Sequence, residues 1–436
     1  MLTAGVSQVD ITPPLGVKLR GYFEERTATT VHDPLYARCF ALERDGVAVV
    51  MMVCDLIALD RKYMDEAKAR IQETTGLLPE QVMIACTHTH TGPETGDDPY
   101  TEWLVDRLAD GVRIAWQARE PVEVGWGHAT EGRVVFNRRY RMKDGTVQTN
   151  PGLRNPEVVE PVGPVDPEVG ALALRRPSGS TVGLLANYTL HYVGIPDDWH
   201  AISADYFGFF STLIQRLRGE TFVAALSNGA CGDINNWDVL HGTAPPNDHY
   251  QHTERVAGLV AAAALWAWNE AEFESDLPLG HAMAEVVLSP RPAPTADDVT
   301  RATEIEQRVE TGQSVLMGER SFAMRVRHLT EEPPQERRTW VQALRIGDLA
   351  LVGIPGELFC ALGLAIKERS PFAQTMVLEL ANDCAGYIPT RRAFEEGAYE
   401  PESSPYAPGF GEQIVEAAVE LLAGLHAGNT GPGREH

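Results

Sequence analysis

The sequence predicts an α/β fold in which mixed β-sheet layers are flanked by helices. Near the N-terminus an apolar strand (46–54), a segment with helical spacing (60–74) and a second strand (81–86) follow one another, and this order is typical of an α/β layer. The same alternation returns at 181–192, 206–217 and 221–226. Residues 36–42 and 46–54 also predict a hairpin, which indicates antiparallel as well as parallel pairing.

The first elements carry the clearest local signals. Val47–Cys54 is apolar without interruption, as expected of a strand that is buried on both faces. Tyr63, Ala67 and Ile71 share one face of the helix over 60–74, and Gly76 is its expected end.

The rest of the chain continues the pattern without an internal sequence repeat. Residues 254–268 are rich in Ala and apolar nearly all round, so this helix should be buried, whereas 296–311 should be a charged helix facing solvent. The remaining expected elements are strands at 339–345, 349–353 and 376–380 and helices at 358–369 and 413–425.

Composition narrows the class of protein. The 436 residues include 37 Lys and Arg against 61 Asp and Glu, a net charge of −24 that argues against nucleic acid and anionic membranes as partners. No apolar run approaches the roughly 20 residues of a membrane span, and no secretory signal pattern opens the chain. Six cysteines without a CxxC pair predict buried, reduced thiols in a cytoplasmic protein. The partner that we expect is a small-molecule substrate.

The candidate functional residues run from position 88 to position 399, so they predict one catalytic domain over residues 1–426. Within it, the charged segment 294–340 is expected to be a peripheral helical insertion. The Gly-rich residues 427–436 are expected to form a disordered tail.

Four segments that could carry chemistry each follow a predicted strand. His88 and His90 lie in Cys86-Thr87-His88-Thr89-His90, and as residues i and i+2 of a strand end they should face the same way. His191 ends the strand over 181–192. Glu357 follows Pro355-Gly356 at a strand-to-helix turn, where a carboxylate at a helix start is the alternative interpretation. Tyr387 follows the strand over 376–380.

Together these residues indicate a metal site. Sites in open α/β sheets form at the carboxyl ends of strands, and two histidines with one carboxylate are a common catalytic zinc set. Each segment alone is equally compatible with a structural role.

The ordered set of segments resembles the catalytic domain of the neutral/alkaline ceramidase family. The resemblance extends from residue 4 to about residue 400. Its segments are Ala4-Gly5-Val6, Asp10-Ile11-Thr12, Thr87-His88-Thr89-His90-Thr91-Gly92-Pro93, Asn137-Arg138, residues 187–191, Ser227-Asn228-Gly229-Ala230-Cys231-Gly232-Asp233, Pro355-Gly356-Glu357 and Ala385-Gly386-Tyr387.

The resemblance implies a zinc amidohydrolase with one Zn²⁺ per chain. The positions that match the family's zinc ligands are His88, His191, Glu357 and Tyr387. Those that match its substrate-facing residues are His90, Arg138 and Tyr399. In the implied mechanism, metal-activated water attacks an amide carbonyl, His90 or Tyr399 polarises the carbonyl or protonates the leaving amine, and Arg138 binds a carboxylate or hydroxyl of the substrate. Asp205 and Asp233 are candidates for orienting the histidines.

Two departures from the family pattern bear on function. Asn235 stands where the family has an active-site serine, so covalent catalysis through an alkoxide is excluded at this position, although the amide could still hold substrate. Only 37 residues follow Tyr399, too few for the family's immunoglobulin-like C-terminal domain. We therefore expect a small soluble substrate rather than membrane ceramide.

Three alternatives accompany this prediction. The same site could open a lactone or ester, or act as a lyase or isomerase on a sugar-like molecule, because these reactions use the same residue types beside a Lewis acid. A non-catalytic, metal-dependent binding protein is the second alternative, favoured by the loss of the serine. A (β/α)₈ barrel amidohydrolase also uses HxH, but the sequence lacks eight regular strand–helix units. Oligomeric state is not readable from the sequence.

Overall fold

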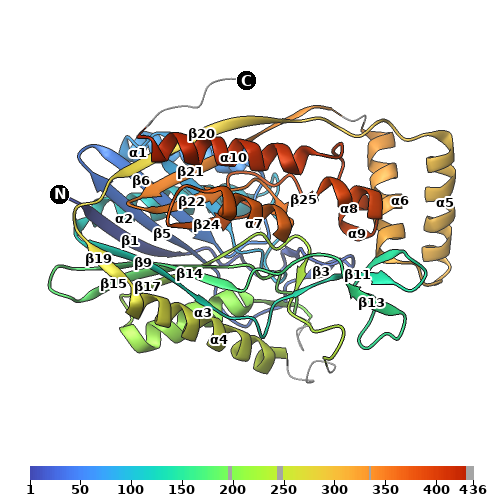
Figure 1. Ribbon diagram of the computed structural model, residues 1–436, viewed down its shortest axis with the longest axis horizontal. Coiled ribbons are helices and arrows are strands. Elements are labelled where there is room, and N and C mark those ends of the chain that lie inside the picture. Colours follow the sequence, from blue (N-terminus) through green and yellow to red (C-terminus); the bar gives the residue numbers. More distant parts are fainter. Residues whose placement is uncertain (195–198, 243–248, 333–334, 429–436) are drawn as a thin grey trace.

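The computed structural model describes residues 1–194, 199–242, 249–332 and 335–428 (Figure 1). Most of the expected tail, residues 429–436, lies outside the described residues. The predicted α/β class is confirmed, because three mixed sheets carry helices on their outer faces. No helix in the described ranges is both long and apolar enough to cross a bilayer.

The three main sheets each combine antiparallel and parallel strands. The first has the order β7-β6-β5-β1-β8 and consists of β1 (Thr3–Asp10), β5 (Tyr36–Arg44), β6 (Val47–Cys54), β7 (Val82–Cys86) and β8 (Glu120–Pro121). The second, β17-β15-β14-β9-β19, consists of β9 (Glu123–Thr130), β14 (Glu168–Arg175), β15 (Thr181–Tyr188), β17 (Val223–Asn228) and β19 (Glu272–Glu274). The third, β20-β21-β22-β24, consists of β20 (Leu279–Leu288), β21 (Arg337–Ile346), β22 (Leu349–Gly353) and β24 (Gln374–Leu378).

One unit of structure occurs three times, once in each sheet. An antiparallel hairpin is followed by a helix and then by a strand parallel to the second strand of the hairpin. The three crossover helices are α1 (Arg61–Thr75), α3 (Asp205–Arg218) and α7 (Cys360–Arg369). The sequence shows no repeat, because the units share element order and burial pattern rather than residues.

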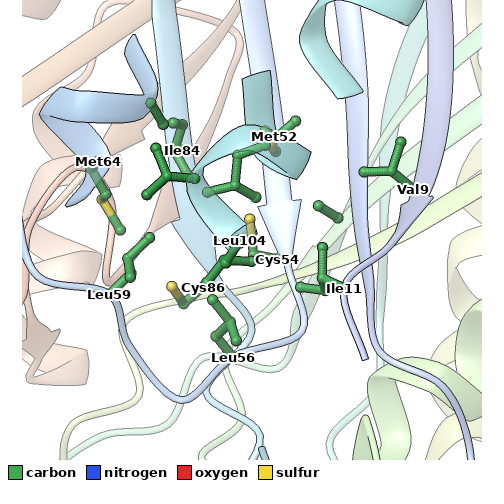
Figure 2. Packing of buried hydrophobic residues seen from close by; sticks show 14 of the residues in the cluster. Val9, Ile11, Met52, Cys54, Leu56, Leu59, Met64, Ile84, Cys86 and Leu104 are labelled. Atoms are coloured by element: carbon green, nitrogen blue, oxygen red, sulfur yellow. The ribbon is translucent and has the colours of Figure 1, made fainter. Parts of the chain in front are cut away.

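A central apolar core lies between the three sheets, and each sheet has a second core on its helical side. Val49, Met51 and Val53 of β6 belong to the central core, whereas the alternate residues Met52 and Cys54 belong to the outer core. This division explains the uninterrupted apolar run. Figure 2 shows part of the outer core, with Met52 and Cys54 of β6 packed near other side chains of the first unit.

Paired helices cover the outer face of each sheet. Helix α2 (Pro99–Gln117) packs with α1 on the first sheet, and Asp98 caps it by accepting hydrogen bonds from the next residues' backbone. Helix α4 (His249–Glu270) joins α3 on the second sheet, and α10 (Phe410–His426) joins α7 on the third. Helices α5 (Ala296–Glu310) and α6 (Met317–Glu331) stand at one end of the molecule, beside α8 (Arg391–Glu396) and α9 (Tyr399–Ser403) (Figure 1).

Short elements complete the chain and surround the strand ends. They are the 3₁₀ helix Pro79–Gln81 and the strands β2 (Lys18–Leu19), β3 (Arg26–Thr27), β4 (Thr30–Val31), β10 (Phe136–Asn137), β11 (Arg139–Met142), β12 (Val147–Thr149), β13 (Val158–Pro161), β16 (Ala201–Ile202), β18 (Ile234–Asn235), β23 (Glu357–Leu358) and β25 (Tyr387–Ile388).

The structure corrects three local expectations. Glu357 is not in the first turn of a helix: it lies in β23, which pairs with β25, and α7 begins three residues later at Cys360. Strand β15 ends at Tyr188, so His191 lies in the following loop. His88 also lies beyond its strand, in a left-handed conformation with φ 70°, so alternation along a strand does not explain how it faces His90.

The buried ion pair of Arg38 and Asp55 supports the strand ends of the first unit. The Asp55 carboxylate accepts hydrogen bonds from Arg38 Nη1 at 2.8 Å and from the Tyr36 amide at 2.9 Å. We expect Asp55→Ala to lower the free energy of unfolding by about 3–5 kcal/mol, because it leaves a buried guanidinium without its partner. Urea unfolding followed by circular dichroism measures this change.

Asp60→Ala is the matched control, because Asp60 is exposed and its side chain makes no capping hydrogen bond. It should change stability by less than about 0.5 kcal/mol. A similar small loss for Asp55→Ala would contradict the role given to the buried pair.

Candidate active site

All eight residues singled out from the sequence line one cavity of about 730 Å³, a size typical of small-molecule sites. They come from all three structural units and from the loops around them. The residues are His88, His90, Arg138, His191, Asn235, Glu357, Tyr387 and Tyr399.

Backbone contacts between neighbouring strand ends place His88. Two carbonyls of the loop after β6 accept hydrogen bonds from His88. The Leu56 carbonyl accepts from the His88 amide at 2.9 Å, and the Ile57 carbonyl accepts from the ring Nδ1 at 2.8 Å. Nδ1 therefore carries the proton, and Nε2 is left with a free lone pair. That Nε2 is buried without a hydrogen-bond partner among the described residues and lies 3.4 Å from Glu357 Oε2.

His90 is held from two sides. Its amide donates to Asp205 Oδ2 at 3.1 Å, and its Nδ1 donates to the Gly21 carbonyl at 2.7 Å. Gly21 has φ 119°, and a Cβ there would lie 2.9 Å from His90 Cα, so the close approach requires glycine. Because Nδ1 is protonated, His90 Nε2 offers its lone pair to His191 Nε2, 3.0 Å away.

His191 is the link between the histidines and Arg138. Its Nδ1 lies 3.1 Å from Arg138 Nη1 and 3.8 Å from Glu357 Oε2. A guanidinium only donates, so His191 Nδ1 is an acceptor and Nε2 carries the proton directed at His90. The lone pair of His88 Nε2 is therefore free, whereas that of His191 Nδ1 accepts from Arg138, and both atoms lie within 4 Å of Glu357 Oε2.

Strand pairing sets Glu357 beside Tyr387. The two residues are partners in the parallel β23–β25 register, and the Glu357 amide donates to the Gly386 carbonyl at 2.9 Å. A Cβ at Gly356 would lie 2.5 Å from that carbonyl oxygen, so glycine permits the pairing. The Tyr387 hydroxyl also helps to hold the pKa of the Glu357 carboxyl below its usual value.

The distances from Glu357 Oε2 to the two imidazoles are close to those between ligands of one metal ion. Ligands bound to one zinc ion at about 2.0–2.1 Å lie roughly 3.3–3.4 Å apart, and Glu357 Oε2 lies 3.4 Å from His88 Nε2 and 3.8 Å from His191 Nδ1. Glu357 Oε2, like His88 Nε2, is buried without a hydrogen-bond partner in the described parts of the chain. Nitrogens of His88, His90 and His191 also lie within 4.8 Å of one another, so a three-histidine set is the second arrangement that could hold an ion.

The pKa values of the three imidazoles are shifted in different directions by their surroundings. Burial lowers the pKa of His88, but the adjacent Glu357 carboxylate outweighs burial and holds that pKa above its usual value. Burial, helped by neighbouring positive groups, lowers the pKa values of His90 and His191 well below the usual range. Burial raises the pKa of Glu357, but His88, Arg138 and Tyr387 together outweigh it and hold the pKa of this carboxyl below its usual value.

Arg138 is held by the protein rather than extended toward solvent. Its Nε donates to Glu400 Oε1 at 2.7 Å and its Nη2 to the Gly232 carbonyl at 2.8 Å, in addition to the contact with His191. Its guanidinium lies over the rings of Tyr387 and Tyr399, 5.3 and 5.8 Å from their centroids. Three donor directions are therefore already used, which limits what is left for substrate.

The remaining expected residues have clear partners. Tyr399 lies at the start of α9 with its ring 5.4 Å from that of Tyr387, and burial raises the pKa of its hydroxyl. Asn235 in β18 donates to Asn150 Oδ1 at 2.8 Å. Asp205 accepts hydrogen bonds from the His90 amide and the Thr89 hydroxyl. Asp233 contacts the Cys360 amide and Asn137, so the expectation that it orients a histidine is wrong.

Several residues of the site carry no recognisable sequence signal. Glu400 is fully buried and pairs with Arg138, but it stands alone in a charged segment. Met317 and Met324 of α6 line the cavity from within the segment 294–340. Arg26 stacks on Tyr22 and donates to the His90 carbonyl at 2.7 Å, which fixes the loop of His90 from the outside.

No protein-family model matches the chain, but curated proteins and solved structures do. A neutral ceramidase of Pseudomonas aeruginosa is 23% identical over 490 aligned residues, which cover 96% of this chain and 72% of the relative. A neutral ceramidase of Mycobacterium tuberculosis is 24% identical, with coverage of 98% and 78%.

The structural matches cover the whole chain. The crystal structure of the Pseudomonas aeruginosa neutral ceramidase aligns with a TM-score of 0.78 at 19% identity and 75% coverage of that chain. A structure described as ceramidase complexed with C2 aligns with a TM-score of 0.77 at 19% identity and 77% coverage. The resemblance predicted from the ordered motifs is thereby confirmed: this chain is a homologue of the neutral ceramidases over nearly its whole length and shares their fold.

Proposed function

We propose that the chain is a zinc-dependent hydrolase that cleaves an amide (N-acyl) bond with an activated water, using one ion per chain. The observation that carries the proposal is the convergence of His88 Nε2, His191 Nδ1 and Glu357 Oε2 on one buried point, where two of these atoms have no other partner among the described residues. The homology to neutral ceramidases, whose name denotes hydrolysis of an amide, supports the reaction type.

We assign the ion to His88, His191 and Glu357, with Tyr387 as the fourth ligand. The two buried atoms without a hydrogen-bond partner among the described residues, His88 Nε2 and Glu357 Oε2, favour this set over the three histidines. His191 Nδ1, 3.8 Å from Glu357 Oε2, would exchange its contact with Arg138 for the ion. Tyr387 adjoins Glu357 through the β23–β25 pairing and lines the same cavity.

When bound, zinc supplies a Lewis acid that activates water and polarises the substrate carbonyl. The chain's own residues manage the protons. Neutral His90 is positioned to accept a proton at Nε2, and the Tyr399 hydroxyl, which burial keeps protonated, can donate to the carbonyl oxygen or the leaving nitrogen. Arg138, held by Glu400, fixes His191 and contributes positive charge beside the reacting carbonyl.

The side chain at position 235 supports direct hydrolysis. An amide cannot form an acyl-enzyme, so water is the attacking group, and Asn235 is left to position substrate from β18. We further propose that residues 1–426 act as one catalytic unit, because the cavity lining runs from Arg20 to Tyr399. The substrate we propose is small and soluble, and a cytoplasmic location agrees with six free thiols.

The metal assignment predicts a coupled loss of ion and activity. Purified wild-type chain should contain about one zinc and release octanoate from simple octanoyl amides, with the mass of one water added across the products. His88→Ala should lose the zinc and at least about 100-fold in kcat/KM, because even residues that only support ligands are worth 10–100-fold. Elemental analysis and mass spectrometry measure the two losses.

His128→Ala is the control, since His128 is exposed on β9 and lies outside the cavity lining. It should keep both zinc and activity. Wild-type chain without metal after reconstitution would argue for a binding protein instead. A product without added water would indicate a lyase.

Tyr399 provides a second test. Tyr399→Phe should lower kcat about 100- to 1,000-fold, since it removes a hydrogen-bond donor that acts on developing charge, while zinc content stays unchanged. Tyr36→Phe, which lies outside the cavity, is the matched control. Equal kcat values for Tyr399→Phe and wild type in steady-state assays would remove Tyr399 from the mechanism.

A further inference from the structure

We propose that the substrate is an N-acyl amino acid, with its carboxylate bound by Arg20 and its acyl chain lying against helix α6. The inference rests on the proposed function and adds the substrate class. Two observations support it. The guanidinium of Arg20 lines the cavity without a carboxylate partner among the described residues, and an apolar wall lines the same cavity.

Arg20 is presented by the hairpin of β2 and β3, which packs against the loop of the catalytic histidines. Leu19 forms a bridge with Pro93, and the Arg20 amide donates to the Gly92 carbonyl at 3.2 Å. The backbone of Arg20 is thereby fixed, while its side chain is exposed and lines the cavity. In the described ranges no ion pair includes this side chain.

The other charged residues of the cavity lining already have partners. Arg138 pairs with Glu400, Glu24 lies 3.8 Å from Arg320, and Glu357 faces His88. In a chain with a net charge of −24, an unpaired guanidinium at the catalytic cavity is unexpected for charge balance alone. It is expected of a site that supplies the counterion for an anionic substrate group.

Arg20 lies beside the histidines of the site through its neighbour in the chain. The carbonyl of the adjacent Gly21 accepts a hydrogen bond from His90 Nδ1 at 2.7 Å. A carboxylate close to the scissile amide, as in an amino acid, could therefore reach Arg20 while the amide lies at the histidines.

The apolar wall is contributed by α6 and by loops across the cavity. Met317 and Met324 come from α6, and Leu153, Trp237 and Val239 line the cavity with them. Helix α6 is held in place, because Gly318 packs against Ala398 and the Arg320 guanidinium lies 4.3 Å from the Phe23 ring centroid. Flexible methionine side chains suit an acyl chain, since they adapt to an apolar ligand.

The reaction balances without a further reactant. Water adds its oxygen to the acyl carbon, the carbon–nitrogen bond breaks, and the departing nitrogen takes a proton. The products are a carboxylic acid and a free amino acid. Both the substrate and the second product carry the carboxylate that Arg20 would bind.

Two octanoyl amides that differ in one group provide the test: N-octanoylglycine carries a carboxylate where N-octanoylethanolamine carries a hydroxymethyl group. Octanoate release, measured by mass spectrometry on the zinc-loaded full chain, gives the ratio of their kcat/KM values. We expect the kcat/KM of wild type to be about tenfold or more higher for the glycine compound, because a hydrogen bond to a charged group contributes about that factor. Arg20→Met should reduce this ratio to about one, chiefly by raising KM for the glycine compound.

Arg20→Gln is the second variant, which keeps a polar side chain in case the apolar replacement disturbs the hairpin, and it should also lose most of the preference. Arg216→Met, which replaces an exposed arginine on α3 outside the cavity, should keep the wild-type ratio. An unchanged ratio in both Arg20 variants would overturn the assignment.

Failure of the proposed hydrolysis can be told apart from failure of this inference. If wild type cleaves neither amide, calorimetric binding of N-(octylsulfonyl)glycine, a sulfonamide that resists hydrolysis, decides the role of Arg20. Binding that Arg20→Met weakens about tenfold supports the carboxylate site even then. Equal affinity in wild type and Arg20→Met contradicts it.

Discussion

The facing pair of His88 Nε2 and Glu357 Oε2 is the constraint on which the rest of the structure depends. Two buried polar atoms 3.4 Å apart without hydrogen-bond partners are costly for a folded protein unless a ligand or ion satisfies them. The structure nevertheless holds both atoms firmly. His88 is fixed through the carbonyls of Leu56 and Ile57, and Glu357 through pairing with Tyr387.

Because the hairpin–helix–strand unit occurs three times around one core, residues that are far apart in the sequence meet at one cavity. Each hairpin–helix–strand unit contributes one side of the central core, and the segments after its second or third strand reach the same cavity. His88 follows the third strand of the first unit, and His191 follows the second strand of the second unit. Glu357 and Tyr387 follow the second and third strands of the third unit. The apolar core thereby sets the relative position of the ligands.

The sequence predicted the layers and the cavity residues better than the local geometry that joins them. Continuous apolar runs such as Val47–Cys54 identify strands, because a strand between two cores cannot alternate with polar residues. The reason given for the His88–His90 pair was wrong, since both lie beyond the strand and the left-handed backbone at His88 turns the rings together. Glu357 was given a helical alternative because its partner strand β25 lies thirty residues away in the chain.

The unpredicted parts of the site depend on long-range contacts. Glu400 stabilises Arg138 across 262 residues of sequence, and no spacing rule could have indicated that pair. Helix α6 lies in the segment 294–340, which was expected to be a peripheral insertion, yet Met317 and Met324 line the cavity, because one face of an amphipathic helix can be charged while the other is apolar. The sequence shows that Asn235 departs from the family pattern, but it does not show that the Asn235 side chain contacts Asn150.

Anomalous diffraction at the zinc absorption edge, recorded from crystals of the zinc-loaded chain, tests the central claim most directly. The account predicts one peak between the units, about 2.0–2.2 Å from His88 Nε2, His191 Nδ1 and a Glu357 oxygen. A peak bound by His90 in place of Glu357, or the absence of a peak at this point, would contradict it.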